Sequence, residues 1–266
     1  MSDSKQEFVI LAFEASADQA SVAVLTSGGA MSIEVHSARH GHAAIITELA
    51  TAALTKAGVT AKDITHVAAG RGPGSFTGIR VALSAAKGFC IAAGGSRIAG
   101  KNGVEETQVL GMGLSCLEAA AFVVRRTLDQ DATQFSDDSF RARAIIATAD
   151  TRRGSFFAQV FSADYRPQDG VTDTDRIIEI DVDSQPPDFF LPESWKGAVI
   201  IGPGADVMTR ALPELELYPM PHTPAIDAAQ IAALAADRLN IGAGFDALVP
   251  LYVAPVFLGP PKVNQS

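Results

Sequence analysis

The sequence predicts an α/β protein of two lobes, each a mixed β-sheet flanked by helices, with a reduced second lobe. Three observations lead to this prediction. Three short apolar runs open the chain in close succession, and helix, strand and helix patterns follow them. A second set of strand-like runs begins at Ala144 and loosely repeats this order. The 266 residues, 47% of them hydrophobic, are also enough for two cores.

The opening strands predict an antiparallel meander. The run F-V-I-L-A-F at 8–13 has the length of a buried strand, and a polar turn at 14–19 separates it from the next run at 20–26. A serine and two glycines at 27–29 lead into a third strand at 30–35. Short turns between three successive strands are typical of two hairpins.

Two helices complete the first lobe. Over 42–57 apolar residues recur three and four positions apart, and Gly58 ends this helix in the way that glycine commonly does. The second helix begins after a glycine-rich turn, with Ser75 or Thr77 as its cap, and continues to about residue 93.

The second half of the chain predicts shorter elements. Strand-like runs occur three times and helical periodicity twice, and a polar, acidic stretch between them is expected to form a loop. The helices lie at 114–126 and 227–239, the strands at 144–149, 156–161 and 199–202, and the loop at 127–143.

These elements suggest a division of the chain into parts. We expect a first lobe over 1–107 and a smaller second lobe over 108–223, with a helix at 224–240 packing back onto the first lobe. The last residues, 258–266, are expected to form a flexible tail.

Charge and cysteine content narrow the function classes. With 21 basic and 30 acidic residues the formal net charge is −9, which argues against a protein that grips nucleic acid by itself. No apolar run approaches the roughly 20 residues that cross a bilayer, and the polar N-terminus is unlike a signal peptide. The two cysteines, Cys90 and Cys116, suggest no disulfide framework, so we expect a cytoplasmic protein.

The most specific segment is a glycine-rich loop. A strand over 64–69 leads into G-R-G-P-G-S-F-T-G-I-R at 70–80, where a loop and a helix start together can bind an anion. It is not a Walker A loop, because Gly78 is not followed by lysine and Ser or Thr. A purely structural turn remains the alternative. The nucleotide or anion candidates are Gly72, Gly74, Ser75, Thr77 and Arg80.

Several motifs together resemble one family. The segment G-P-G-S-F-T-G-I-R at 72–80 resembles the signature of the TsaB/YeaZ family, degenerate paralogues of TsaD in the actin-like ATPase superfamily. Residues 10–16 look like the family's I-L-A-I-D-T-S, and 113–119 are similar to its G-V-S-S-L-E-A. D-T-R-R-G from Asp150 resembles D-A-R-R-G, and P-L-Y-V from Pro250 resembles P-x-Y-L. The resemblance covers most of the chain, apart from an acidic stretch near 128–142 that looks like an insertion.

The resemblance implies a fold of two actin-like (ribonuclease H-like) lobes and a role as a non-catalytic subunit. Such a subunit forms a heterodimer with TsaD, and the ATPase TsaE docks on the pair. The complex transfers a threonylcarbamoyl group to the adenosine 3′ of the anticodon in tRNA. The resemblance further implies a homodimer in the absence of TsaD, tRNA contact only through the complex, and no membrane association. It implies no tightly bound cofactor and leaves open ATP or ADP at the complex interface.

The candidate surface for this partnership is the helix pair 42–57 and 76–93. Both helices carry more apolar surface than covering one sheet requires, which favours a second packing partner. The candidate contact residues are Ile45, Ile46, Leu49, Ala53, Phe76, Ile79, Leu83, Ala86 and Cys90.

Two departures from the family of catalytic paralogues argue against an enzyme. TsaD-like subunits hold a metal with an H-x3-H pair on a helix, and the corresponding positions here are Cys116 and Ala120. Glu14 stands where actin-like ATPases have an aspartate that organises metal and phosphate. The pair His36 and His40 has helical metal-ligand spacing, but it lies at a strand end, where a solvated loop is the better interpretation.

Two other function classes stay open. An actin-like small-molecule kinase would be expected to be longer and to carry a complete phosphate loop in each lobe. An M22-like peptidase is the other alternative, although neither H-E-x-x-H nor G-x-S-x-G occurs in the sequence.

Overall fold

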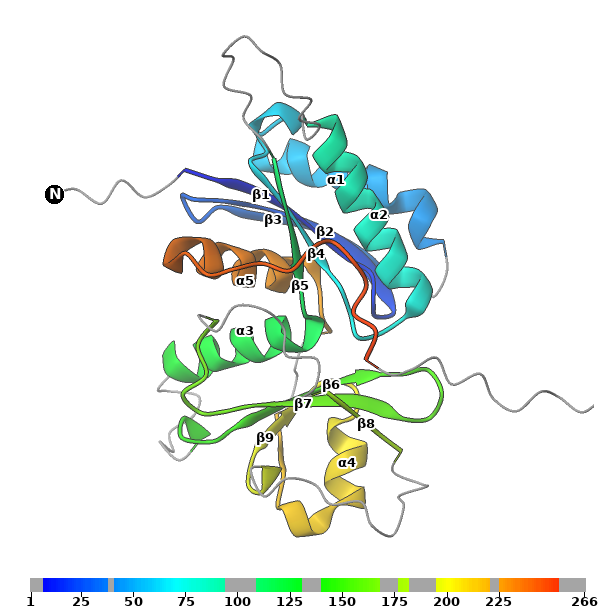
Figure 1. Ribbon diagram of the computed structural model, residues 1–266, viewed down its shortest axis with the longest axis vertical. Helices are drawn as coiled ribbons and strands as arrows, with labels where there is room; N and C mark the ends of the chain where they lie inside the picture. The colour runs from blue at the N-terminus through cyan, green and yellow to red at the C-terminus, as the bar shows by residue number, and fades with distance from the viewer. Residues whose placement is uncertain are drawn as a thin grey trace, which may run out of the picture.

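The computed structural model describes residues 7–37, 41–93, 109–130, 140–167, 177–181, 195–220 and 225–253. Two lobes are stacked along the long axis of the molecule, and each contains a five-stranded mixed sheet (Figure 1). The strand order is β3-β2-β1-β4-β5 in the first sheet and β8-β7-β6-β9-β10 in the second. The two sheets therefore have the same topology, and the expected α/β fold of two lobes is confirmed.

The first sheet begins with the expected meander. Strands β1 (Val9–Glu14), β2 (Gln19–Thr26) and β3 (Met31–Ser37) pair antiparallel in sequence order. β4 (His66–Gly70) then pairs parallel with β1, and β5 (Leu110–Leu114) pairs parallel with β4.

Strand β5 corrects the expected boundary of the first lobe. It was not predicted, because its sequence L-G-M-G-L contains two glycines, and glycine is depleted in strands. Since β5 belongs to the first sheet, that lobe extends to Leu114 and does not stop at residue 107.

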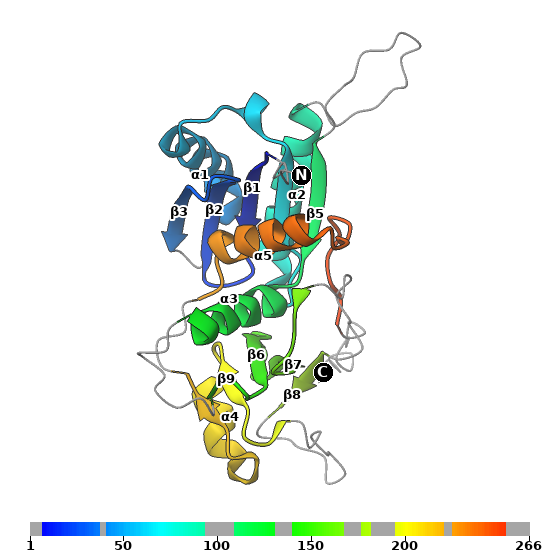
Figure 2. The ribbon, with the colours of Figure 1, turned by 90° about the vertical axis from the view of Figure 1, so that its left-hand side faces the viewer.

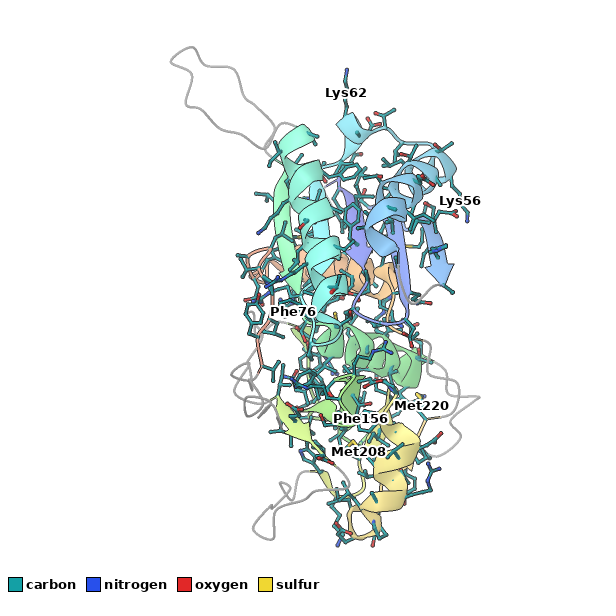
Figure 3. All side chains as sticks on the ribbon, turned by 90° about the vertical axis from the view of Figure 1, so that its right-hand side faces the viewer. Lys56, Lys62, Phe76, Phe156, Met208 and Met220 are labelled. Carbon is teal, nitrogen blue, oxygen red and sulfur yellow. The ribbon has the colours of Figure 1, made fainter. Side chains whose placement is uncertain are left out.

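Helices α1 (His42–Ala57) and α2 (Phe76–Ala92) cover one face of the first sheet (Figure 3). The C-cap of α1 is Gly58, with φ of 69°, and its N–H bonds the carbonyls at the helix end, as expected. The cap of α2 is Ser75, whose hydroxyl accepts from the Gly78 N–H at 3.3 Å, so Thr77 is not the cap.

The other face of the first sheet is covered by the last helix of the chain, α5 (Ala228–Ile241). Asp227 caps it, since its carboxylate accepts from the Ala229 and Gln230 backbone N–H groups at 2.9 and 3.1 Å. Beside α5 lies α3 (Cys116–Gln130), which packs with its other side against the second sheet. Figure 2 shows the two helices between the sheets. Each lobe thus contributes a helix to the junction.

The second sheet has the topology of the first, but several of its strands are shorter. Its strands are β6 (Ile145–Asp150), β7 (Phe156–Phe161), β8 (Ile178–Ile180), β9 (Val199–Ile201) and β10 (Tyr218–Pro219), with α4 (Ala205–Ala211) after β9. Short 3₁₀ turns lie at Ala61–Asp63 and Pro213–Leu215. None of the helices in the described part of the chain is both long and apolar enough to span a bilayer.

Two of the loop and tail predictions concern residues that are only partly described. The loop expected over 127–143 begins later than predicted, because α3 continues to Gln130. Most of the rest of that stretch, 131–139, and the tail expected at 258–266 lie outside the described residues.

Buried charges brace the two lobes. On α3, Glu118 accepts from Arg238 of α5 at 2.5 Å and from the hydroxyl of Tyr165, which follows β7. Both charged side chains are almost fully buried. Breaking such a pair from one side leaves an uncompensated buried charge, at a cost of about 3–5 kcal/mol. Glu118 therefore fastens α3 to both lobes at once.

Candidate functional site

Three loops meet where the lobes face each other. They are the turn between β1 and β2 (15–18, the first turn), the turn between β6 and β7 (151–155, the second turn) and the glycine loop after β4 (71–75). Together with the start of α3 they line a cavity of about 320 Å³ (the inter-lobe cleft). Each turn lies between the first two strands of its lobe, so the duplicated topology places the two opposite each other.

The first turn carries a buried carboxylate. Glu14 is fully buried at the end of β1, and its Oε1 accepts from the Ser16 backbone N–H at 2.5 Å. Its Oε2 accepts from the thiol of Cys116 at 3.2 Å. Burial raises the pKa of Glu14, an effect that the hydrogen bonds from Ser16 only partly oppose. Both carboxylate oxygens of the side chain are therefore engaged in hydrogen bonds within the protein.

Cys116, the first residue of α3, is equally enclosed. The Ser16 hydroxyl donates to its sulfur at 3.4 Å, and burial together with Glu14 raises the pKa of the thiol well above its usual range. Cys116 and Ala120 lie one helical turn apart, and both line the inter-lobe cleft. These are the positions that the family resemblance compares with a histidine pair, and they present a hydrogen-bonded thiol and a methyl group.

No metal cluster is formed in the part of the chain that the structure describes, where no three His, Cys, Asp or Glu side chains come together. His36 lies on β3, the edge strand of the first sheet, and His40 is outside the described residues.

The glycine loop is packed onto the first turn. The Ser75 N–H donates to the Ser16 carbonyl at 2.8 Å. A Cβ on Gly74, whose φ is 152°, would lie 2.7 Å from that same carbonyl oxygen, and one on Gly78 would lie 1.8 Å from the Ala15 oxygen. Only glycine allows this approach of α2 to the turn. Gly74 and Gly78 thus have a structural task, as does Gly72, whose φ is 96° and where a Cβ would lie 2.5 Å from Cδ1 of Ile79. The Ser75 hydroxyl is used as the helix cap.

The second turn is exposed and highly charged. Arg152, in the left-handed region with φ of 63°, pairs with Asp18 of the first turn at 2.8 Å and lies 3.9 Å from Asp150. Arg153 pairs with both carboxylate oxygens of Glu179 at 3.1 and 3.2 Å. Arg152 therefore forms an ion pair between the two lobes.

Thr77 and Arg80 do not line the inter-lobe cleft. They line a second cavity, of about 530 Å³, between the start of α2, the second turn and residues 250–253. The Arg80 guanidinium lies 3.7 Å from the centre of the Phe76 ring and donates to the Tyr252 hydroxyl at 3.3 Å. Four of the five anion candidates, Gly74, Ser75, Thr77 and Arg80, therefore line this second cavity, and Gly74 lines the inter-lobe cleft as well.

The candidate partner residues require a correction. Most of them form the core between the helices and their own sheet, because an amphipathic helix turns its largest side chains toward the sheet that it covers. Ile46, Leu49, Ala53, Ile79, Leu83 and Ala86 are buried there. Ile45 and Cys90 are partly buried, and Phe76 is 55% exposed. The six buried side chains cannot contact a partner directly.

Sequence reasoning missed the side chains that complete these sites. Tyr252 was seen only as part of a motif, and its position beside Arg80 joins residues 172 positions apart. Arg71, buried under residues 246–251, was likewise not singled out, although it pairs with Asp246 at 2.5 Å. A charged residue inside a glycine-rich loop was the available signal.

Comparison of the sequence with known proteins gives a partial match. Residues 19–98 match the family model described as TsaD, tRNA N6-adenosine threonylcarbamoyltransferase. Two proteins of that name from Streptococcus pneumoniae, strains ATCC 700669 / Spain 23F-1 and CGSP14, are 42% and 41% identical to this chain over 102 residues. Each match covers 32% of this chain and 30% of the relative, so the chain aligns with less than a third of the length of these curated relatives.

Solved structures match nearly the whole chain. One, described as an uncharacterized protein from Pseudomonas aeruginosa with similarity to peptidase YEAZ, has a TM-score of 0.65 at 19% identity and covers 93% of this chain and 100% of its own. YeaZ from Pseudomonas aeruginosa has a TM-score of 0.62 at 19% identity, with coverage of 92% and 99%. The expected resemblance to the TsaB/YeaZ type of actin-like fold is confirmed.

Proposed function

We propose that this protein is a non-catalytic subunit of a tRNA threonylcarbamoyl-transfer complex. Its YeaZ fold and the match of residues 19–98 to the TsaD family model support this proposal. In this proposal the protein pairs with a TsaD-type catalytic subunit in the cytoplasm, a TsaE-type ATPase docks on the pair, and tRNA is held through the complex. The protein holds no cofactor tightly by itself, and the interface between the subunits is the site open to ATP or ADP.

The observation that carries the proposal is the face that α3 turns toward the inter-lobe cleft. Cys116 and Ala120 lie there one turn apart, at the positions compared with metal-binding histidines. The thiol is buried, its pKa is raised, and it is hydrogen bonded to Glu14. A metal needs deprotonated ligands with free lone pairs, and this arrangement offers neither a thiolate nor a second ligand. A supporting role is therefore favoured over catalysis.

The surface best suited to the partner is the outer side of the α1–α2 pair. Thr51 and Thr55 of α1 donate their hydroxyls to carbonyls of their own helix at 3.0 and 2.8 Å. Their polar groups are thus already satisfied, and burying them against a partner costs little. Small exposed residues on α2, Ser84 and Gly88, would allow a second pair of helices to approach closely.

The test is co-purification with the TsaD-type subunit of the same cell, followed by an assay for the threonylcarbamoyl nucleoside with TsaE and tRNA present. The pair should make the nucleoside, and the isolated protein should not. Thr51→Glu should abolish both co-elution and product. Thr127→Glu is the matched control, since Thr127 is an exposed helical threonine with the same carbonyl bond, but on α3. Buried Leu49 and Leu83 are unsuitable, because a charge there would unfold the lobe.

Two outcomes would count against the proposal in different ways. Product formed by the isolated protein, or no product from the wild-type pair, would contradict the assigned function. If the wild-type pair is active and Thr51→Glu still co-elutes, the function stands but the partner surface lies elsewhere, with the second lobe the next candidate.

A further inference from the structure

The larger cavity, of about 530 Å³, lies outside the inter-lobe cleft and has no part in the function proposed above. Figure 3 shows Phe76 at the end of α2 nearest the second lobe, where this cavity opens. We call it the arginine groove. Its principal residues are Phe76, Arg80, Arg152, Arg153, Leu251 and Tyr252.

Two of the three arginines are already neutralised by carboxylates of the chain. Arg152 pairs with Asp18 at 2.8 Å, and Arg153 binds Glu179 through both carboxylate oxygens. The groups that pair with these two guanidiniums are thus carboxylates of the chain itself, which has a net charge of −9.

Arg80 differs from its two neighbours. Its described partners, the Phe76 ring and the Tyr252 hydroxyl, are both neutral. The side chain is exposed, and its planar group has five N–H donors in a geometry that matches a carboxylate. The stacking on Phe76 and the bond to Tyr252 hold this donor group in place, which lowers the entropy cost of binding a ligand there.

The remaining wall of the groove is apolar and partly accessible. Phe76 and Tyr252 are 55% and 57% exposed, and Leu251, Phe157 and Ile79 lie beneath them. Tyrosine, arginine and phenylalanine are the residues enriched at the centres of protein interfaces. The groove therefore combines an apolar floor with one well-positioned cation.

We propose that the arginine groove binds a short acidic and apolar peptide segment of a protein partner, with one carboxylate on Arg80 and an apolar side chain against Phe76 and Tyr252. A polyphosphate fits less well, because Asp18 and Asp150 offset the charge of Arg152 and Glu179 offsets that of Arg153, which leaves Arg80 to meet several negative charges. A nucleic acid would also need a broad basic surface, which a chain of net charge −9 does not favour.

The test is a fluorescence anisotropy titration of the full chain with a labelled peptide of alternating glutamate and leucine, compared with glutamine–leucine and lysine–leucine peptides. The wild type should bind only the glutamate peptide. Arg80→Glu should weaken binding at least about tenfold, the loss expected for one charge-assisted hydrogen-bonded pair. Arg80→Lys should fall between, because lysine lacks the planar fork. Lys87→Glu is the matched control on α2 and should bind like the wild type.

The proposal is overturned if the wild type does not bind the glutamate peptide at millimolar concentration, or if Arg80→Glu binds it as well as the wild type does. Tighter, Arg80-dependent binding of pyrophosphate or tRNA in the same titration would also overturn it, in favour of a phosphate site. Circular dichroism checks the folding of each variant, and Arg80→Gln replaces Arg80→Glu if the charge reversal disturbs the helix.

Discussion

The first and second turns occupy equivalent places in two sheets of the same topology, yet the charged side chains beside them lie in opposite environments. β1 and β6 are both six-residue strands that end in an acid, Glu14 and Asp150. The Glu14 side chain is fully buried and bonded within the protein, whereas Asp150 is only half-buried and lies beside Arg152. What encloses each turn explains the difference: the glycine loop and the start of α3 cover the first, and no comparable described segment covers the second.

Equivalent backbone positions in the two lobes thus do not give their acidic side chains the same environment or role. The acid of the first turn has become part of the core, so changes around it should alter stability. The charged side chains of the second turn are accessible to solvent. Changes there should therefore alter the binding of ligands or partners and leave the fold intact. Each of the following predictions tests one side of this contrast.

The largest effect is expected from valine at the glycine that contacts the first turn. Gly74→Val introduces a Cβ 2.7 Å from the Ser16 carbonyl oxygen at a positive φ, so it should lower the free energy of unfolding by at least about 2 kcal/mol. Gly154→Val in the second turn also has a positive φ but nothing within 4 Å, and should cost about 1 kcal/mol. Denaturant melts of both variants measure the two losses.

Equal losses in the two variants would break the comparison. If Gly74→Val instead melts like the wild type but abolishes nucleoside formation in the reconstituted complex, the glycine loop is a ligand or partner site and not a structural turn.

The second prediction concerns the pH dependence of stability. Burial raises the pKa of Glu14 in the folded protein, so the folded state holds this proton more tightly than the unfolded state. The contribution of Glu14 to stability is therefore complete at pH values below its unfolded pKa and is lost as the pH rises through the folded pKa. Glu14→Gln removes this loss, and its melting temperature should exceed that of the wild type by an amount that grows as the pH rises above the unfolded-state pKa of glutamate.

The matched control for the second turn is Glu179→Gln. Glu179 is partly exposed and pairs with Arg153 at the surface, so its replacement should change the free energy of unfolding by no more than about 1 kcal/mol. A wild-type slope in Glu14→Gln would show that the buried carboxylate is not the group that titrates.

The smallest effect is expected from the ion pair between the turns. Both Arg152 and Asp18 are substantially exposed, so Arg152→Ala should change the free energy of unfolding by no more than about 1 kcal/mol. Arg153→Ala, which breaks a pair within the second lobe, should have a similarly small effect. Thermal melts at low and high salt measure both. A loss of several kcal/mol for Arg152→Ala alone would mean that this pair holds the lobes together.

Much of the fold could be predicted because its signals are local. The meander of β1 to β3, helix α1 with Gly58 and helix α5 with Asp227 follow from apolar periodicity and capping residues that stand next to each other in the sequence. Strand β5 was missed because glycines interrupt it, and β8, β10 and α4 because they are too short to show a period.

The candidate site could be predicted only in part, because it depends on contacts across long sequence separations. The bond between Glu14 and Cys116 joins residues 102 positions apart, and no local pattern announces it. On α2, apolar residues occur nearly all round, so periodicity could not tell that Leu83 faces the sheet while Phe76 faces outward. The motifs located the loops, and only the fold could assign their side chains to surfaces.

The position of α5 has a consequence for the order in which the molecule is completed during synthesis. The strands of the first sheet leave the ribosome early, but the helix that covers their inner face, including Ile10, Ala12 and Ala68, comes near the end of the chain. Until α5 arrives, that face has no cover from its own helix, and a nascent chain carrying it is open to aggregation and chaperone capture. The first lobe therefore begins to form early in synthesis but is completed only when α5 has been made. A chain truncated after α3 should yield an insoluble first lobe.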